Sequence, residues 1–191
     1  MEKHYEIVCE ERVFKTPRME GVRRTLRAED GDEFTHTIIK SQPSVAIIVR
    51  KEGKIAFIKQ LRSTTGKYYL EIPAGLLNEG EGSILDAAKR EVREETGLIA
   101  KDVKLLVHGP SLLDPSKSDE DFGVAIASVC GEKKQALDEN ERIDSRIIWL
   151  PENEVFSRLK EQMSTGRPFF DELFLSGHTM YALLAYNFLR N

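Results

Sequence analysis

Residues 71–98, EIPAGLLNEGEGSILDAAKREVREETGL, contain the stretch that decides the fold of this chain. The second half of the stretch predicts a single helix from Ser83 to Thr96. Ser83 is a suitable N-cap, and Gly97 follows the last turn, where a residue with left-handed backbone geometry is favoured. Most residues between these two caps are good or acceptable helix formers.

The acidic residues of this helix do not lie on its solvent side. At about 100° per residue, one side of the helix is apolar and consists of Ile84, Leu85, Ala88 and Val92. Glu91 and Glu95 are four residues apart, so they stack near this apolar side and face the protein. Glu94 lies on the flank, one turn after Arg90.

A solvated run of charges is the usual explanation of a helix rich in Glu and Arg, but such a run lies opposite the apolar side. Two carboxylates at the edge of a core repel each other and resist ionisation unless a cation lies between them. A hard divalent cation with oxygen ligands is the simplest remedy, and Mg²⁺ is the usual one beside phosphates. The sequence therefore predicts a metal site on this helix.

The nine residues REVREETGL, from Arg90 to Leu98, resemble the Nudix box when Gly75 and Glu81 are included. In that pattern Gly is followed after five residues by Glu, and after seven more by Arg-Glu-aliphatic-any-Glu-Glu-any-Gly-aliphatic. Here eight residues separate Glu81 from Arg90. We expect the extra residue in the loop before the helix, which leaves the role of Glu81 open but not that of the three helix glutamates.

The segments before the box resemble the branch of the Nudix family that cleaves ADP-ribose and nucleotide sugars. EIPAG, residues 71–75, is similar to the E-x-P-A-G sequence of that branch. The resemblance implies that the Ala74 carbonyl is a metal ligand, because hard cations accept backbone oxygens. It also places Glu71 in the substrate site, with Arg62 of the QLR segment holding phosphate oxygens. Without the resemblance, these residues would be a turn and a surface arginine.

Two further loops carry the same resemblance. DPSKSDE, residues 114–120, is similar to the S-P-G-x-S-D-E loop of enzymes acting on ADP-ribose, which assigns Pro115 and Glu120 to substrate binding. Asp at position 114 and Ser at position 116 depart from that pattern and weaken the substrate assignment. DENE, residues 138–141, resembles the acidic loop that supplies a catalytic glutamate in this branch, although an acidic loop is more commonly just solvated.

A general base is expected outside the box, because metal coordination lowers the basicity of the box glutamates. Glu139 is the favoured residue, and Glu120 and Glu141 are the alternatives. The metal ligands are expected to be Ala74, Glu91, Glu95 and Glu94. Arg90 and Glu94 are also assigned to the catalytic machinery, with Arg90 holding the carboxylates in place through Glu94.

Composition limits the other classes of function. The chain has 191 residues, of which 40% are apolar and 31% charged, with a net charge of −4. This is the composition of a globular protein, and it gives no support to a nucleic-acid partner, which needs a basic surface. No apolar run approaches the 18 residues of a membrane span, and the N-terminus lacks a signal-peptide core. With only Cys9 and Cys130, we expect a reduced, cytoplasmic protein.

We expect residues 1–42 to form a small antiparallel β module. Its predicted strands are Tyr5–Phe14, Gly21–Ala28 and Phe34–Lys40, with an Asp-Gly turn before the last. Three polar strands bury too little surface to be stable alone. They must pack on the main domain or on a second subunit, and we predict a homodimer through this module.

Residues 43–191 are predicted to form the Nudix hydrolase domain. The predicted strands are 44–49, 54–61, 68–72, 103–107, 122–129 and 143–150, and the predicted helices after the box are 152–163 and 177–189. This order of elements predicts an α/β protein with a mixed sheet. The resemblance sharpens the prediction to an α/β/α sandwich around that sheet.

The resulting hypothesis is a hydrolase dependent on Mg²⁺ or Mn²⁺, with two or three ions, that cleaves ADP-ribose to AMP and ribose 5-phosphate. GDP-mannose, other nucleotide sugars, dinucleotides and oxidised nucleoside triphosphates are alternative substrates. A sensor that binds a nucleotide sugar without cleaving it is the rival from another class. The four histidines and Cys130 receive no role, and Thr179 is interpreted as structural.

Overall fold

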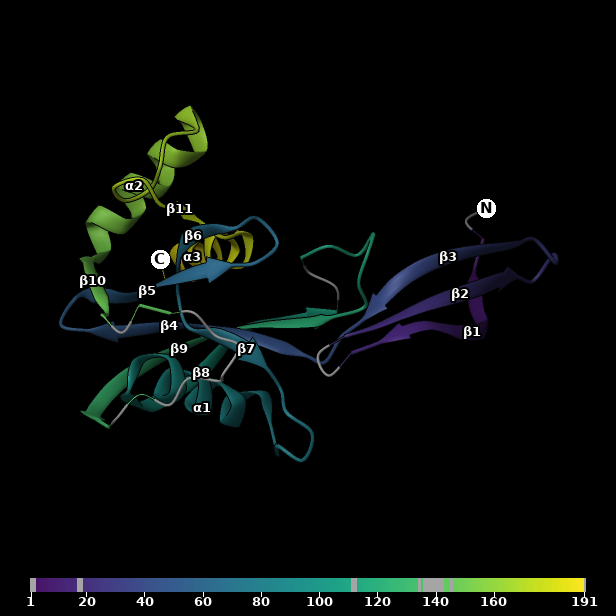
Figure 1. The fold of residues 1–191 in the computed structure, drawn as a ribbon, viewed down its shortest axis with the longest axis horizontal. Coiled ribbons are helices and arrows are strands. Elements are labelled where there is room, and N and C mark those ends of the chain that lie inside the picture. Colours follow the sequence, from purple (N-terminus) through teal and green to yellow (C-terminus); the bar gives the residue numbers. More distant parts are fainter. Residues whose placement is uncertain are drawn as a thin grey trace. The chain divides into compact units, whose positions relative to one another are not determined.

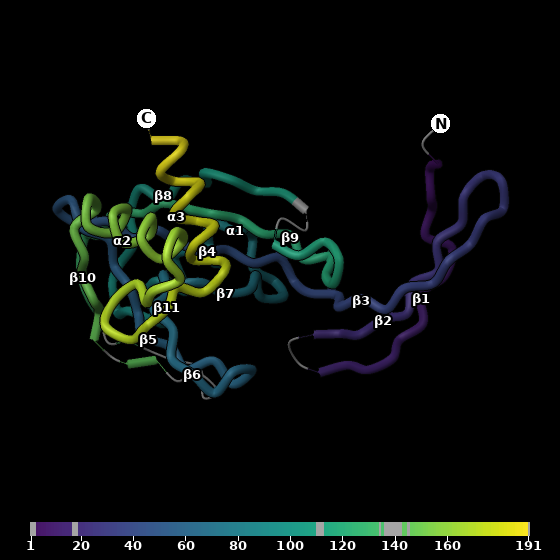
Figure 2. The backbone as a smooth tube through the Cα atoms, turned by 90° about the horizontal axis from the view of Figure 1, so that it is seen from above, coloured from purple at the N-terminus to yellow at the C-terminus, as the bar shows by residue number. Residues whose placement is uncertain are grey.

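The structure is a computed structural model, and it describes residues 3–16, 19–110, 113–133, 135, 143–144 and 146–190. The chain divides into two compact units. The first consists of residues 1–43 and 109–122, and the second of residues 44–108 and 123–191. Figures 1 and 2 trace the chain through both units, which are described separately below.

The first unit is built on a three-stranded antiparallel sheet in the order β1-β2-β3. Its strands are β1 (Tyr5–Lys15), β2 (Glu20–Ala28) and β3 (Glu33–Lys40). The three predicted strands are therefore confirmed to within a residue or two. The central strand β2 carries the buried apolar side chains of this sheet, Val22 and Ala28, whereas ten of the eleven residues of β1 are exposed.

The 113–120 segment belongs to the same unit and lies along β3. Ser118 forms a bridge with Ile39, and the Ile39 amide donates to the Lys117 carbonyl at 2.8 Å. Arg24 reaches from β2 to the Asp119 carboxylate at 2.9 Å. The long loop of the sequence is thus tied to the N-terminal sheet by backbone and side-chain bonds.

The second unit contains an eight-stranded sheet in the order β11-β6-β5-β4-β9-β8, with β10 on β5 and β7 on β4. Its strands are β4 (Ser44–Lys51), β5 (Lys54–Arg62), β6 (Lys67–Glu71), β7 (Ala74–Leu76), β8 (Leu98–Pro110), β9 (Asp121–Glu132), β10 (Ile148–Pro151) and β11 (Phe174–Leu175). β6 pairs in parallel with β11 and antiparallel with β5, so the sheet is mixed as predicted.

Helices cover both faces of this sheet, as Figure 1 shows. They are α1 (Ile84–Thr96), α2 (Glu152–Thr165) and α3 (Gly177–Leu189). α1 packs on β4 and β7, α3 packs on β4, and α2 packs on β10, β5 and α3. The α/β/α sandwich around a mixed sheet, with a small N-terminal antiparallel sheet, is therefore confirmed.

The central strand β4 explains why both faces need a helix. Val45, Ile47 and Val49 belong to the core cluster that includes Ala88 and Val92 of α1. Successive side chains of a strand point to opposite faces, so the residues between them face α3. All five residues from 45 to 49 have no exposed surface. A continuous apolar run is what a strand buried on both faces requires.

The caps of α1 are those predicted. The Ser83 hydroxyl accepts from the Asp86 amide at 3.2 Å and donates to the Asp86 carboxylate at 2.7 Å. Gly97 has φ of 73° and donates its amide to the Arg93 carbonyl at 2.9 Å. The helix therefore begins and ends where the sequence indicated.

Several strand predictions were wrong in extent. The strand expected from residue 103 begins at Leu98, because the Lys133 amide binds the Gly97 carbonyl at 2.6 Å and draws the chain into the sheet directly after α1. The strand expected from residue 143 begins at Ile148, and Ile143 forms only an isolated bridge to Gln60. β7 and β11, with three and two residues, were not predicted, because so short a segment shows no alternation.

In the described part of the chain, none of the helices is long and apolar enough to cross a membrane.

Gly97 and Gly166 make a matched pair for testing what the Gly97 cap contributes. Both follow a helix with φ near 70°, but a Cβ on Gly97 would lie 2.5 Å from the Lys133 carbonyl oxygen, whereas Gly166 has open space. We expect Gly166→Ala to lower the free energy of unfolding by about 1–2 kcal/mol through the left-handed backbone alone. Gly97→Ala should cost about 2 kcal/mol more, because a backbone group must shift. Urea denaturation measures both, and equal losses would show that the contact with Lys133 is unimportant.

Candidate active site

Arg90 is the hub of the box residues. Its guanidinium donates to Glu81 at 2.7 and 3.2 Å, to Glu91 at 2.6 Å and to Glu94 at 3.0 Å. It also donates to the Leu76 carbonyl at 2.7 Å. Burial lowers the pKa of Arg90, but the three carboxylates raise it further, so the net shift is upward and the charge is retained. The predicted pairing of Arg90 with Glu94 is present, and Glu94 is one of four groups that accept hydrogen bonds from Arg90.

The longer spacing before the box does not detach Glu81 from this hub. The Glu81 carboxylate accepts two bonds from Arg90 and one from the Asn78 amide at 2.7 Å. Glu81 lies ahead of the N-cap Ser83 and so before the first helical turn. Glu81 therefore joins the turn before the helix to the Arg90 side chain.

Glu91 and Glu95 lie on the protein side of α1, as predicted. Their residues are 6% and 1% exposed, and the Ala74 amide donates to the Glu95 carboxylate at 3.0 Å. A Cβ placed on Gly75 would lie only 1.9 Å from a Glu91 carboxylate oxygen. The backbone of residues 74–75 thus approaches both carboxylates, and only a residue without a side chain permits this approach at position 75.

These oxygens fit a hard divalent cation. Two buried carboxylates lie beside residues 74–75, and the Glu91 carboxylate occupies the place that a side chain on Gly75 would take. Carboxylate and backbone oxygens are the ligands that Mg²⁺ and Mn²⁺ prefer. Among the residues that the structure describes, no three His, Cys, Asp or Glu side chains are grouped as a metal site. Glu94 and Glu91 both bind Arg90 in this arrangement.

Arg62 and Glu71 also meet, and a third residue joins them. Arg62 donates from Nε to Glu71 at 2.8 Å and from Nη2 to its other oxygen. His178 Nε2, at the start of α3, lies 3.2 Å from the same carboxylate. Burial raises the pKa of Glu71, but the bonds from His178 and Arg62 lower it, and the net shift is downward. The sequence analysis gave His178 no role, because nothing in its local pattern distinguishes it.

The remaining predicted residues belong to the first unit or lie outside the described residues. Pro115 and Glu120 belong to the first unit, in the segment along β3, and the Glu120 amide donates to the Ser118 hydroxyl at 3.1 Å. The box residues belong to the second unit. Glu139 is the favoured general base and Glu141 is an alternative. Both lie outside the described residues, so their assignment stays a prediction.

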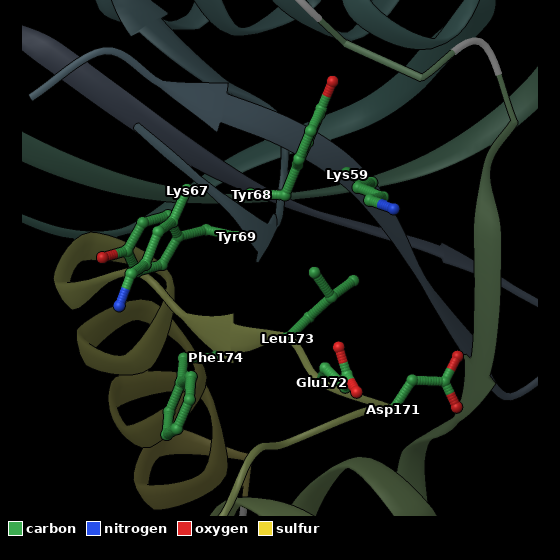
Figure 3. A pocket seen from close by; sticks show the side chains of 8 residues that line it. All are labelled: Lys59, Lys67, Tyr68, Tyr69, Asp171, Glu172, Leu173 and Phe174. Atoms are coloured by element: carbon green, nitrogen blue, oxygen red, sulfur yellow. The ribbon is translucent and has the colours of Figure 1, made fainter. Parts of the chain in front are cut away.

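A pocket of about 740 Å³ at the β6 edge of the sheet is a separate candidate. Lys59, Tyr68 and the 171–174 turn line it, together with Lys67 and Tyr69 (Figure 3). Tyr68 and Tyr69 are consecutive in a strand and point to opposite sides, as Figure 3 shows. The ammonium of Lys59 lies 4.8 Å from the centre of the Tyr68 ring. Its polar groups do not converge on one position, so this pocket does not define a site.

Comparison with known proteins agrees with the geometry around Arg90. The profile of the NUDIX domain matches residues 40–173. A putative nudix hydrolase 2 of Caenorhabditis elegans is 36% identical over 124 residues, and the match covers 60% of this chain and 55% of that protein. The ADP-ribose pyrophosphatase of Bacillus subtilis is 32% identical over 146 residues, and the match covers 75% of this chain and 77% of that protein.

A solved structure described as an ADP compounds hydrolase has the same fold. It superposes with a TM-score of 0.71 at 21% identity, over 96% of this chain and 92% of the other. The chain belongs to the NUDIX family. An ADP-ribose pyrophosphatase is among the relatives it matches, in agreement with the branch of the family predicted from the sequence. The chain spans only about half the length of the C. elegans relative.

The close approach of Gly75 to Glu91 yields the first test of the site. Gly75→Ala should weaken binding of Mn²⁺ at least about 10-fold, because the new methyl group must displace the Glu91 carboxylate. Gly82→Ala is the matched control, since its Cβ would be in ordinary contact, 3.4 Å from Asp86. Calorimetric titration with Mn²⁺ measures both affinities. Unchanged affinity in Gly75→Ala would exclude Glu91 as a ligand.

The Glu81–Arg90 pair yields a second test, on stability. Arg90 lowers the pKa of Glu81 below its ordinary value of 4.5. A lowered pKa stabilises the fold at pH values above 4.5, and that contribution is lost as the pH falls through the folded-state pKa. Glu81→Gln should therefore cost about 1–3 kcal/mol at pH 7. The difference from the wild type should shrink below pH 4.5 in urea titrations, and a difference independent of pH would contradict the pairing.

Proposed function

We propose that the protein hydrolyses ADP-ribose to AMP and ribose 5-phosphate with the help of Mg²⁺ or Mn²⁺. The observation that carries this proposal is the Arg90 hub, which fixes Glu91 and Glu94 beside Glu95 and the Ala74–Gly75 backbone. A buried set of hard oxygens suits a divalent cation and, with it, a diphosphate substrate. The EIPAG segment and the name of the B. subtilis relative favour ADP-ribose among diphosphates.

Glu91, Glu95 and the Ala74 carbonyl would hold the metal, with Glu94 as a further ligand. Two or three bound ions would neutralise the phosphate oxygens of the substrate. The neighbouring residues hold these carboxylates in position. Arg90 keeps Glu91 and Glu94 at a fixed separation, and the Ala74 amide keeps the Glu95 carboxylate turned towards the loop.

The reaction needs a phosphate-binding residue and a base. Arg62, at the end of β5, would hold the diphosphate, since a guanidinium matches phosphate oxygens. Water attacks one phosphorus, the bond to the bridging oxygen breaks, and the proton of the water passes to a carboxylate. We assign that carboxylate to Glu139, because metal coordination would lower the basicity of Glu91 and Glu95.

A substrate screen tests the proposal. Purified protein with Mg²⁺ is offered ADP-ribose, GDP-mannose, other ADP-sugars and dinucleotides, and the products are separated by chromatography. We expect ADP-ribose to show the highest kcat/KM, AMP to appear in equal amount with ribose 5-phosphate, and a chelator to abolish the reaction. GDP-mannose as the preferred substrate would replace the assigned sugar nucleotide. Tight binding of ADP-ribose with no turnover would favour a sensor.

Glu139→Gln tests the assignment of the base. It should lower kcat about 100-fold or more, in the range of a lost general base, with little change in KM or in the Mg²⁺ dependence. Glu120→Gln is the matched comparison on the other candidate loop. Full activity in Glu139→Gln together with an inactive Glu120→Gln would move the base to the 114–120 loop. Full activity in both would mean that no carboxylate of these loops takes the proton.

We also propose that the protein is a cytoplasmic homodimer joined through its N-terminal sheet. On β1, Ile7, Val8, Val13 and Phe14 are each more than 40% exposed. A strand that exposes so many apolar side chains favours a partner surface, and a second copy is the simplest one. Light scattering at micromolar concentration should give twice the mass of the chain. A fully active monomer would exclude this assembly.

A further inference from the structure

We propose that His178 and Glu71 are positioning residues that hold Arg62 in the orientation in which it binds the diphosphate of the substrate. This inference rests on the proposed function, in which Arg62 makes that contact. It changes the role expected for Glu71, which the sequence resemblance placed in contact with the substrate. It also gives a role to the first turn of α3.

The burial of Glu71 excludes direct substrate contact. Its residue has no exposed surface, whereas the Arg62 side chain is 38% exposed. Both carboxylate oxygens are engaged, one by Arg62 Nε at 2.8 Å and the other by Arg62 Nη2 and His178 Nε2. A buried carboxylate in this state binds a neighbouring side chain, and the exposed end of Arg62 is the part that can reach a ligand.

The geometry of a guanidinium explains how Arg62 can serve both partners. A carboxylate that binds side-on occupies the edge formed by Nε and one terminal nitrogen. The opposite edge, with Nη1, points away from that carboxylate. Fixing one edge of the guanidinium therefore sets the direction of the opposite edge. This lowers the conformational entropy that is lost when a phosphate binds.

His178 completes this arrangement from a distant part of the chain. Its Nε2 lies 3.2 Å from Glu71, and the hydroxyl of Ser176 lies 3.3 Å from its Nδ1. The next residue, Thr179, is fully buried, and its hydroxyl accepts from the Ile72 amide at 3.1 Å. Consecutive residues of α3 thus bind consecutive residues at the end of β6, and the His178 contact favours the orientation of the Glu71 carboxylate that binds Arg62.

Alternatives for these residues are weaker. Glu71 as a metal ligand would have to give up its bonds with Arg62 or His178, because both of its oxygens are engaged. His178 as a base would need contact with water at the substrate, but its Nε2 faces the Glu71 carboxylate. A purely structural link between α3 and β6 remains as the competing explanation, and the experiment below is designed to separate it from positioning.

The experiment is a double-mutant cycle on Arg62→Ala and His178→Ala, with His108→Ala as an exposed matched control. The probe is α,β-methylene-ADP, a nucleoside diphosphate that cannot be hydrolysed at its bridge, and its Kd is measured by calorimetry with Mg²⁺ present. We expect Arg62→Ala to raise Kd about 10–50-fold and His178→Ala about 5–10-fold, typical of lost or misdirected charge-assisted bonds. In the Arg62→Ala background, His178→Ala should have almost no further effect.

Two further measurements separate positioning from structure. His178→Gln, which can donate a bond to Glu71, should restore most of the affinity. In steady-state kinetics with ADP-ribose, His178→Ala should raise KM more than it lowers kcat. Equal effects of His178→Ala in both backgrounds, or no rescue by His178→Gln, would overturn the proposal. Wild-type affinity in Arg62→Ala, or no binding of the probe by the wild type, would overturn it as well.

The outcomes for the two proposals are distinguishable. If the wild type binds the probe and the cycle is non-additive, but ADP-ribose is not cleaved, then the inference holds and the proposed function fails. If ADP-ribose is cleaved and the cycle is additive, then the function holds and the inference fails. Glu71→Gln is not used as the main variant, because a change at a fully buried position can unfold the protein.

Discussion

The candidate active site depends on one guanidinium. Arg90 is a helix residue, yet three of its acceptors lie on three different carboxylates and a fourth is a backbone carbonyl of β7. Without this cation, Glu81, Glu91 and Glu94 would repel one another at the edge of the core. Arg90 therefore neutralises part of the acidic cluster and ties the helix, the preceding turn and the β7 loop into one body. The more buried Glu91 and Glu95 can then face the loop together.

The two faces of β4 connect this cluster to the rest of the second unit. On one face, Val45, Ile47 and Val49 support α1 and hence the carboxylates. On the other, the strand packs against α3, whose first turn binds Glu71 and the Ile72 amide. Residues 72–74 are therefore held from two sides by helices that are distant in sequence. This is a physical reason for a sandwich around this site, because neither helix alone fixes both Arg62 and the carboxylates.

Local chemistry explains what could be predicted from the sequence. Some features depend only on neighbouring residues, so they could be predicted from the sequence pattern alone. These are the caps Ser83 and Gly97, the hydrophobic periodicity of α1 and the continuous apolar segment of β4. β7 and β11 were not predicted, because two or three residues are too few to show an alternation of apolar and polar side chains. His178 was given no role, because it acquires one only through its contact with Glu71, which is far away along the chain. The placement of Arg62 against Glu71, rather than towards solvent, likewise depends on the tertiary fold.

The contact between Ile72 and Thr179 joins residues 107 positions apart. Contacts of such long sequence separation form late, because the loop between them must close first. Ile72 can therefore gain this bond only after α3 has docked. During synthesis on the ribosome, the box helix and its acidic cluster would emerge well before that step. A chain that stops before Thr179 would thus contain the box helix but lack the bond that holds Ile72.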